Sequence, residues 1–90
     1  MNTENGKSKS VILIVDDSEM NREMLSEILK DDYDILEAPD GAEAITVIKE
    51  HEREIDLVLL DIVMPVMDGF EVLALMNKYK WIEYIPVIMI

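Results

Sequence analysis

Two short apolar runs that each end in aspartate constrain the fold of this chain most. Residues 11–15 are a continuous run of strand-forming residues followed by Asp16 and Asp17, and residues 55–60 are a second such run followed by Asp61. If these runs form neighbouring parallel strands, the three carboxylates meet at the edge where open α/β sheets bind ligands. Mg²⁺ prefers oxygen ligands and takes carboxylates, with water and phosphate oxygens completing its octahedron. The sequence therefore predicts a divalent-cation site at Asp16, Asp17 and Asp61.

Strand-like and helix-like patterns alternate along the rest of the chain. Apolar runs at residues 33–38 and 86–90 are typical of two further strands, and the three intervening segments space their apolar residues as helices with one buried face do. Crossovers of this length imply parallel strands, with helices on both faces of the sheet. We expect an α/β protein in the order β-α-β-α-β-α-β. The side chains expected to face inward from the three helices are Met20, Met24, Leu25, Ile28 and Leu29, then Ala44, Ile45 and Ile48, then Phe70, Val72, Leu73, Met76 and Tyr79.

Polar and small residues mark the helix boundaries. Ser18 is a candidate cap of the first helix, and Asp40 with Glu43 is expected to form a capping box for a helix over residues 42–51. Gly41 is interpreted as part of a turn. Gly69 is interpreted as a tight turn into the third helix, where the preceding Asp68 serves as a cap and not as a ligand. We expect Met64 and Met67 to shield the site. We expect Trp81 and Tyr84 to close the core.

The composition describes one small acidic domain. The chain has 90 residues, half of them apolar, and a formal charge of −12, which argues against nucleic acid or an anionic membrane as a direct partner. It has no cysteine, so disulfides, thiolate metal sites and a cysteine nucleophile are excluded. Residues 1–10 form a polar leader, and no apolar run approaches the roughly 20 residues that span a bilayer. We therefore expect a cytoplasmic protein.

The combined motifs resemble the receiver domain of two-component response regulators. The resemblance rests on the acidic pair after the first strand, on Asp61 with the Met-Pro-Val-Met-Asp-Gly run at residues 64–69, and on the proline-led fourth strand, and it covers residues 11–90. It implies a flavodoxin-like fold with strand order 2-1-3-4-5. It also implies that Asp61 is the phosphoacceptor, that Asp17 binds Mg²⁺ directly, that Asp16 acts largely through water, and that the backbone carbonyl of Val63 is a further ligand.

The same resemblance implies partners and a metal. Mg²⁺ is the expected cofactor, and Mn²⁺ can take its place. The phosphoryl group would come from a histidine kinase or a phosphotransfer protein, and the signal would pass to an output partner or domain. These are the properties of a phosphoacceptor and not of a turnover enzyme.

The sequence also departs from the receiver pattern. Receivers carry a Ser or Thr after the fourth strand and a Lys on a fifth strand, whereas the given sequence stops at Ile90. We therefore expect residues 11–90 to be the N-terminal part of a receiver domain without the last helix-strand-helix, either a fragment or a natural degenerate form. Such a fragment should be impaired in phosphorylation, and it should self-associate through its uncovered fourth strand.

Two other classes of function remain open. Haloacid-dehalogenase-type phosphatases also use an aspartate nucleophile with Mg²⁺, but in an Asp-x-Asp pattern that neither residues 16–18 nor residues 61–63 match. A pseudo-receiver would act as a scaffold that binds a partner by shape. That class usually lacks one of the acidic ligands, whereas this chain has all three.

Overall fold

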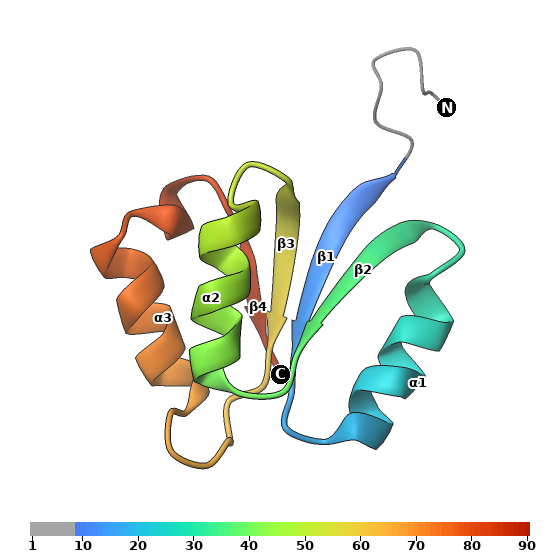
Figure 1. The fold of residues 1–90 in the computed structure, drawn as a ribbon, viewed down its shortest axis with the longest axis horizontal. Coiled ribbons are helices and arrows are strands. Elements are labelled where there is room, and N and C mark those ends of the chain that lie inside the picture. The colour runs from blue at the N-terminus through green and yellow to red at the C-terminus, as the bar shows by residue number, and fades with distance from the viewer. Residues whose placement is uncertain (1–8) are drawn as a thin grey trace.

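One parallel sheet with helices on both of its faces forms the fold (Figure 1). The computed structural model describes residues 9–90, so most of the predicted polar leader lies outside the described residues. The strands lie in the order β2-β1-β3-β4, and all three pairings are parallel. The predicted fold class and element order are confirmed. The elements are β1 (Ser10–Val15), α1 (Glu19–Leu29), β2 (Tyr33–Ala38), α2 (Gly41–His51), β3 (Ile55–Leu60), α3 (Gly69–Lys78), the short 3-10 helix η2 (Trp81–Glu83) and β4 (Val87–Met89).

Alternation along the strands divides the apolar residues between the two faces of the sheet. Leu13, Val15, Val58 and Leu60 are fully buried and belong to one core cluster with side chains of α2 and α3. Figure 1 shows α2 and α3 together on this side of the sheet and α1 on the other. A strand whose two faces are both covered needs apolar residues at every position, which is why β1 reads as a continuous apolar run.

The predicted buried stripe of α1 is wrong. Met20, Met24 and Ile28 are exposed, Met20 to 76%, and α1 has no buried residue. The reason is that, within the described chain, α1 is the one helix on its face of the sheet, where it packs over β1 and β2. A second helix beside it would be needed to cover the outer side of the stripe. The apolar pattern of α1 is therefore real, but half of it has no neighbour in this structure.

The side chains predicted to face inward from α3 are buried in the middle of the helix but exposed at its two ends. Val72 and Met76 are fully buried, whereas Phe70 and Tyr79 are exposed. Tyr79 stacks instead on Trp81, with ring centroids 4.9 Å apart. Trp81 is buried in the core, as expected. Side chains in the first and last turns of a short helix extend past the sheet beneath it, so helical spacing alone overestimates their burial.

Both helices on the core side begin with an aspartate cap and a glycine. Asp68 caps α3 with a complete capping box, in which its carboxylate accepts from Glu71 N and its own N–H donates to Glu71 Oε1. At α2 the structure contains one half of the predicted box, the bond from Glu43 N to Asp40 Oδ1 of 2.8 Å. Both aspartates therefore cap their helices as predicted. The second bond of the capping box, from the cap N–H to the glutamate side chain, is seen at α3.

The glycines that follow these caps are helical residues and not turn residues. Gly69 is the first residue of α3, and a Cβ atom built on it would lie 2.5 Å from the carbonyl oxygen of Asp61. Gly41 is the first residue of α2, and its added Cβ would collide with Met67. Neither glycine has the positive φ that a left-handed turn requires. Positions 41 and 69 require glycine because the loop that follows Asp61 approaches them closely, and not because a turn does.

Strand β4 forms one edge of the sheet. Its bounds are shorter than the predicted residues 86–90, but hydrogen bonds continue past it, from Ile90 N to Leu60 O (2.9 Å) and from Ile62 N to Ile90 O (3.2 Å). Val87 and Met89 pack against the core, whereas Ile88 is 50% exposed on the opposite face. The face that carries α1 is therefore partly uncovered next to β4.

Candidate metal centre at the carboxyl edge of the sheet

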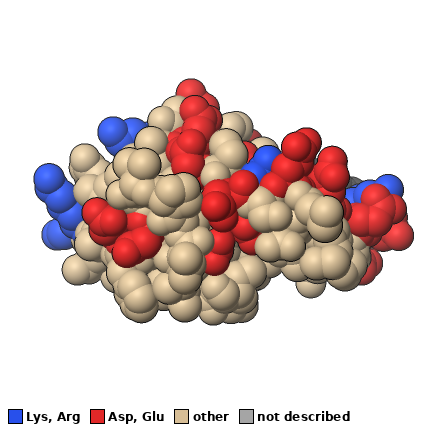
Figure 2. All heavy atoms as spheres, turned by 90° about the horizontal axis from the view of Figure 1, so that it is seen from below, with Lys and Arg blue, Asp and Glu red and all other residues tan. Residues whose placement is uncertain are grey.

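Direct pairing of β1 with β3 brings the predicted aspartates together. Val15 and Leu60 are partners at the ends of these strands, and Asp61 N donates to Val15 O at 2.9 Å. One carboxylate oxygen from each of Asp16, Asp17 and Asp61 lies within 4.8 Å of the other two. Figure 2, which views the molecule from the side where the strands end, shows acidic side chains in the middle of this face. The register of two strands is thus enough to assemble the cluster.

Asp16 is the most firmly held of the three. Its side chain is buried, with 5% of the residue exposed, and it accepts hydrogen bonds from Ser18 N (2.9 Å) and, more weakly, from Asn21 Nδ2 (3.5 Å). Arg22 Nη1 donates to the main-chain carbonyl of Asp16 at 2.7 Å, and Arg22 Nε pairs with Glu37 at 3.2 Å. The first turn of α1 therefore fixes both the carboxylate and the backbone of Asp16. Sequence reasoning missed Ser18, Asn21 and Arg22 in this role, because no spacing rule singles them out.

Asp61 lies at the start of a closed loop. Its Oδ1 accepts from Val63 N at 3.2 Å, and the loop returns to its own base where Gly69 N donates to Ile62 O at 2.9 Å. Met64, which was expected to shield the site, is instead buried in the core, so it anchors the loop from beneath. The main chain of Val63 is therefore placed next to the Asp61 carboxylate.

The pKa of Asp61 is raised above the ordinary aspartate value. Burial of the carboxylate is the largest cause, and the negative charges of Asp16 and Asp17 act in the same direction. The hydrogen bond from Val63 N opposes the shift but does not cancel it. A cation in the site would favour the ionised form of Asp61, because it would offset both the desolvation of the carboxylate and the repulsion from Asp16 and Asp17.

The raised pKa predicts a pH dependence of stability for the metal-free protein. The folded state holds the Asp61 proton more tightly than the unfolded chain, so this group costs no stability below the ordinary aspartate pKa of about 3.9. The cost develops as pH rises from that value through the higher folded pKa. Thermal melts of wild type and Asp61→Asn should therefore converge at the acid end of this window and diverge above it, with the variant the more stable. A difference in melting temperature between the two proteins that is the same at all pH values would contradict the raised pKa of Asp61.

The donor set fits a hard divalent cation. All three side chains offer carboxylate oxygens, which Mg²⁺ and Mn²⁺ prefer, and none offers the nitrogen or sulfur that favours zinc or copper. The excess of negative charge at the cluster also favours a divalent cation. Because Asp16 already accepts two hydrogen bonds, Asp17 and Asp61 have more free lone pairs for direct coordination.

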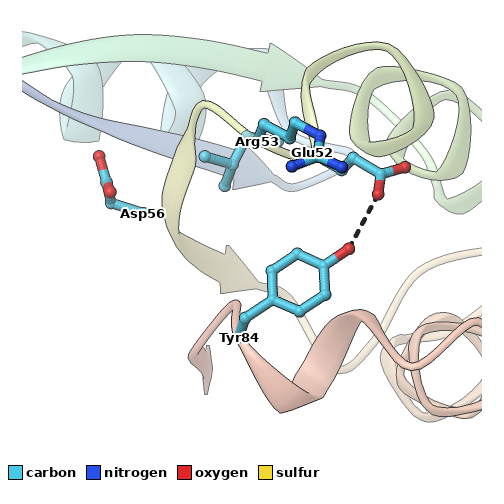
Figure 3. Close-up of a pocket in the computed structure, with 5 residues that line it drawn as sticks. Glu52, Arg53, Asp56 and Tyr84 are labelled. Atoms are coloured by element: carbon cyan, nitrogen blue, oxygen red, sulfur yellow. Dashed lines mark hydrogen bonds between the residues drawn. The ribbon is translucent and has the colours of Figure 1, made fainter.

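A hollow of about 450 Å³ lies at the opposite, amino-terminal edge of the sheet (Figure 3). It is lined by side chains that include Glu52, Arg53 and Tyr84, and Tyr84 Oη donates to Glu52 Oε1 at 2.9 Å. Tyr84 was expected to close the core, but it is exposed and its ring stands beside this hollow. None of the three cluster aspartates lines this hollow, so it is separate from the acidic cluster.

The fold and the cluster together define a doubly wound α/β domain with a carboxylate site at the carboxyl ends of its strands. The family model described as the response regulator receiver domain matches residues 12–90. The chain therefore belongs to the response regulator receiver family, as its motifs suggested. This places it among the signalling domains of two-component systems.

Known proteins similar to this chain include a chemotaxis protein and a much longer protein that the chain matches over a small part of its length. The chemotaxis protein CheY of Halobacterium salinarum is 44% identical over 69 residues, which cover 76% of this chain and 56% of that protein. A probable cyclic di-GMP phosphodiesterase of Vibrio cholerae is 44% identical over 81 residues, which cover 90% of this chain and 18% of that protein. The chain thus spans little more than half of the first relative's length and less than a fifth of the second's.

Solved structures agree with the fold. Chemotaxis protein CheY4 of Vibrio cholerae superimposes with a TM-score of 0.82 at 33% identity, covering 90% of this chain and 67% of that one. The CheX–CheY complex of Borrelia burgdorferi, which contains BeF₃ and Mg²⁺, gives a TM-score of 0.83 at 37% identity and covers 99% of this chain and 66% of that one. None of the helices within residues 9–90 combines the length and hydropathy needed to cross a membrane.

Proposed function

We propose that this chain is a phosphoacceptor in which Asp61 receives a phosphoryl group with the help of Mg²⁺. The observation that carries the proposal is the cluster itself, in which oxygens of Asp16, Asp17 and Asp61 lie within 4.8 Å of one another in a member of the receiver family. The solved relative that contains Mg²⁺ and BeF₃ supports the choice of ion. In this role the domain is a signalling component and not a turnover enzyme.

The residues around the cluster have distinct proposed roles. Asp17 and Asp61 would bind the ion directly, with the backbone carbonyl of Val63 as a further ligand, and Asp16 would act largely through water. The two hydrogen bonds that Asp16 already accepts support its outer role. The closed loop after Asp61, which sets the main chain of Val63 beside the carboxylate, supports the part given to Val63. Mn²⁺ offers the same hard-ion chemistry and should substitute for Mg²⁺.

The chemistry requires little more of the protein than position and charge. A carboxylate oxygen of Asp61 attacks the phosphorus of a phosphohistidine in line, so that an O–P bond forms as the N–P bond breaks. The histidine nitrogen leaves with the electron pair of that bond and takes a proton from water. Bound Mg²⁺ supplies the positive charge that offsets the phosphoryl oxygens and the three carboxylates. Asp16, fixed by the first turn of α1, keeps the ion's surroundings in place during transfer.

The proposed donor is a histidine kinase or a phosphotransfer protein, and the proposed receiver of the signal is an output partner or domain. Similarity to a protein named sensor histidine kinase CheAY, which is 34% identical over 92 residues, supports a link to such kinases. The charge of −12 is unfavourable for direct contact with nucleic acid or an anionic membrane, and we propose a cytoplasmic location.

Phosphorylation by a small phosphodonor tests the proposal. After incubation with acetyl phosphate and Mg²⁺, mass spectrometry should find one acyl phosphate at Asp61 that is absent without Mg²⁺ and absent in Asp61→Asn.

Other outcomes of the same experiment distinguish the alternatives. Catalytic consumption of the phosphodonor without accumulation of phosphoprotein would indicate an aspartate-nucleophile phosphatase. No labelling and no Mg²⁺ binding would indicate a scaffold that recognises its partner by shape. The matched control is Asp68→Asn, which removes the same charge from a capping residue and should leave the position of the label unchanged.

A further inference from the structure

The loop between Asp61 and α3 comes into close contact with the start of α2 at Gly41. A Cβ atom built on Gly41 would lie 2.8 Å from both Cγ and Sδ of Met67 and 2.9 Å from Met67 Cβ. Rotating the Met67 side chain would move Cγ and Sδ but leave its Cβ in place. Any residue larger than glycine at position 41 therefore has to displace the backbone of the loop.

The backbone next to this contact is strained. Val66 has a φ of 68°, a conformation that β-branched residues avoid, and Met67 N donates to Pro65 O at 2.7 Å across it. The Val66 side chain is fully exposed, with a relative accessibility of 101%, so its own packing does not hold this conformation. Strained backbone persists where the residues on either side fix it. On one side of Val66 the fixed neighbour is Met67, seated on Gly41.

Besides the buried Met64, the loop is held at two further places. At its base, Gly69 lies against the Asp61 carbonyl and donates to Ile62 O at 2.9 Å. At its far end, Met67 rests on Gly41 of α2, an element that follows a different strand. Val63, whose N–H bonds the Asp61 carboxylate, lies between these two points of support. A shift at Met67 therefore reaches Val63 along residues 64–66, of which Val66 is the strained one.

We propose that Gly41 and Met67 are positioning residues for the cation site, acting through the loop that carries Val63. The inference rests on the proposed function, because it assigns these residues a role in the same Mg²⁺ site. It also explains Gly41 where turn geometry does not, since its φ is not positive. Neither residue belongs to the cluster of aspartates, so each would act on the ion through the placement of the loop.

Gly41→Ala tests this role. We expect the dissociation constant for Mg²⁺, measured by calorimetry, to rise about tenfold, the effect typical of losing a residue that orients a ligand. A purely structural role predicts a different pattern. The clash with Met67 would lower the melting temperature, while Mg²⁺ would bind as tightly as in wild type.

Removing the side chain that collides should rescue the variant. In Gly41→Ala/Met67→Gly the clash is gone, because glycine at position 67 also lacks the Cβ that lies 2.9 Å away. Affinity should therefore return to that of Met67→Gly alone, and the two substitutions should be strongly non-additive. Thr46→Ala, on the exposed side of the same helix, serves as the control and should bind normally. Equal affinity in wild type and Gly41→Ala, or an equal loss with and without Met67, would overturn the proposal.

A second readout separates this proposal from the proposed function. In the metal-free protein the backbone amide resonance of Val63 should shift in Gly41→Ala and return in the double variant. This measurement tests the positioning of the loop even if wild type binds no Mg²⁺, a result that would overturn the proposed function alone. An unmoved Val63 amide in Gly41→Ala would show that the contact does not position the loop.

Discussion

Replacing Asp17 by asparagine is expected to weaken Mg²⁺ binding about 10- to 100-fold while making the metal-free protein more stable. The first effect follows from the proposed role of Asp17 as a direct ligand, whose charged oxygen the substitution would remove. The second follows from repulsion, since two carboxylates within 4.8 Å repel by about 3 kcal/mol at an effective dielectric of ~20. Because Asp17 is exposed, solvent reduces this to roughly 1 kcal/mol, or a rise of about 4 to 8 °C in melting temperature.

Calorimetric titration and thermal melts with and without Mg²⁺ measure both effects. Asp34→Asn is the matched control, because it removes the same charge from an exposed position on β2 and should change neither quantity appreciably. Mg²⁺ should stabilise the wild type more than the Asp17→Asn variant, so the order of their melting temperatures should reverse as the ion is added. Unchanged Mg²⁺ affinity in Asp17→Asn would refute the assignment of the site.

A polypeptide of these 90 residues is expected to form dimers or larger oligomers. On the face of the sheet that carries α1, the side chains of Met24, Ile28 and Ile88 are at least half exposed, and β4 lies at the sheet edge without a charged residue to blunt it. Exposed apolar faces and unpaired strand edges are the usual sites of self-association. The charge of −12 opposes it, so association should strengthen as salt screens the charge.

Light scattering at micromolar concentration measures the oligomer directly. Ile88→Lys places a charge on both the edge strand and the open face, and it should shift the chain towards monomer. Ile82→Lys is the control, because Ile82 is also exposed but lies in η2, away from β4. A wild-type chain that is monodisperse, monomeric and cooperatively folded would show that the sheet protects its own edge.

The fold and the acidic cluster were predictable because each strand, with any aspartate that follows it, is recognisable within one short stretch of sequence. Apolar runs that end in aspartate fix the strands and their polarity, so the convergence of Asp16, Asp17 and Asp61 needs only the pairing of β1 with β3. The burial of α1 was not predictable in this way. Helical spacing shows which side of a helix is apolar, but whether that side is covered depends on elements elsewhere in the fold, and here Met20 has no covering neighbour.

The contacts that hold the site in place could not be predicted from the sequence. Gly41 and Gly69 look like ordinary turn glycines after an aspartate, and only the approach of the loop to within 2.5 to 2.9 Å of their missing side chains reveals why they are glycine. Arg22 similarly looks like a surface residue of an amphipathic helix. Its bond to the Asp16 carbonyl depends on how α1 leaves the sheet, which no local spacing encodes.

The pairing of β1 with β3 would also make the proposed cation site a reporter of the docking of β3. Asp16 and Asp17 follow the first strand, whereas Asp61 follows the third, so the cluster is complete only in a segment that contains residues 16–61. A partly folded intermediate with β1, α1 and β2 in place would hold two of the carboxylates and lack the other. Divalent ions should therefore favour only states in which β3 has docked, and the appearance of tight binding during refolding would time that step.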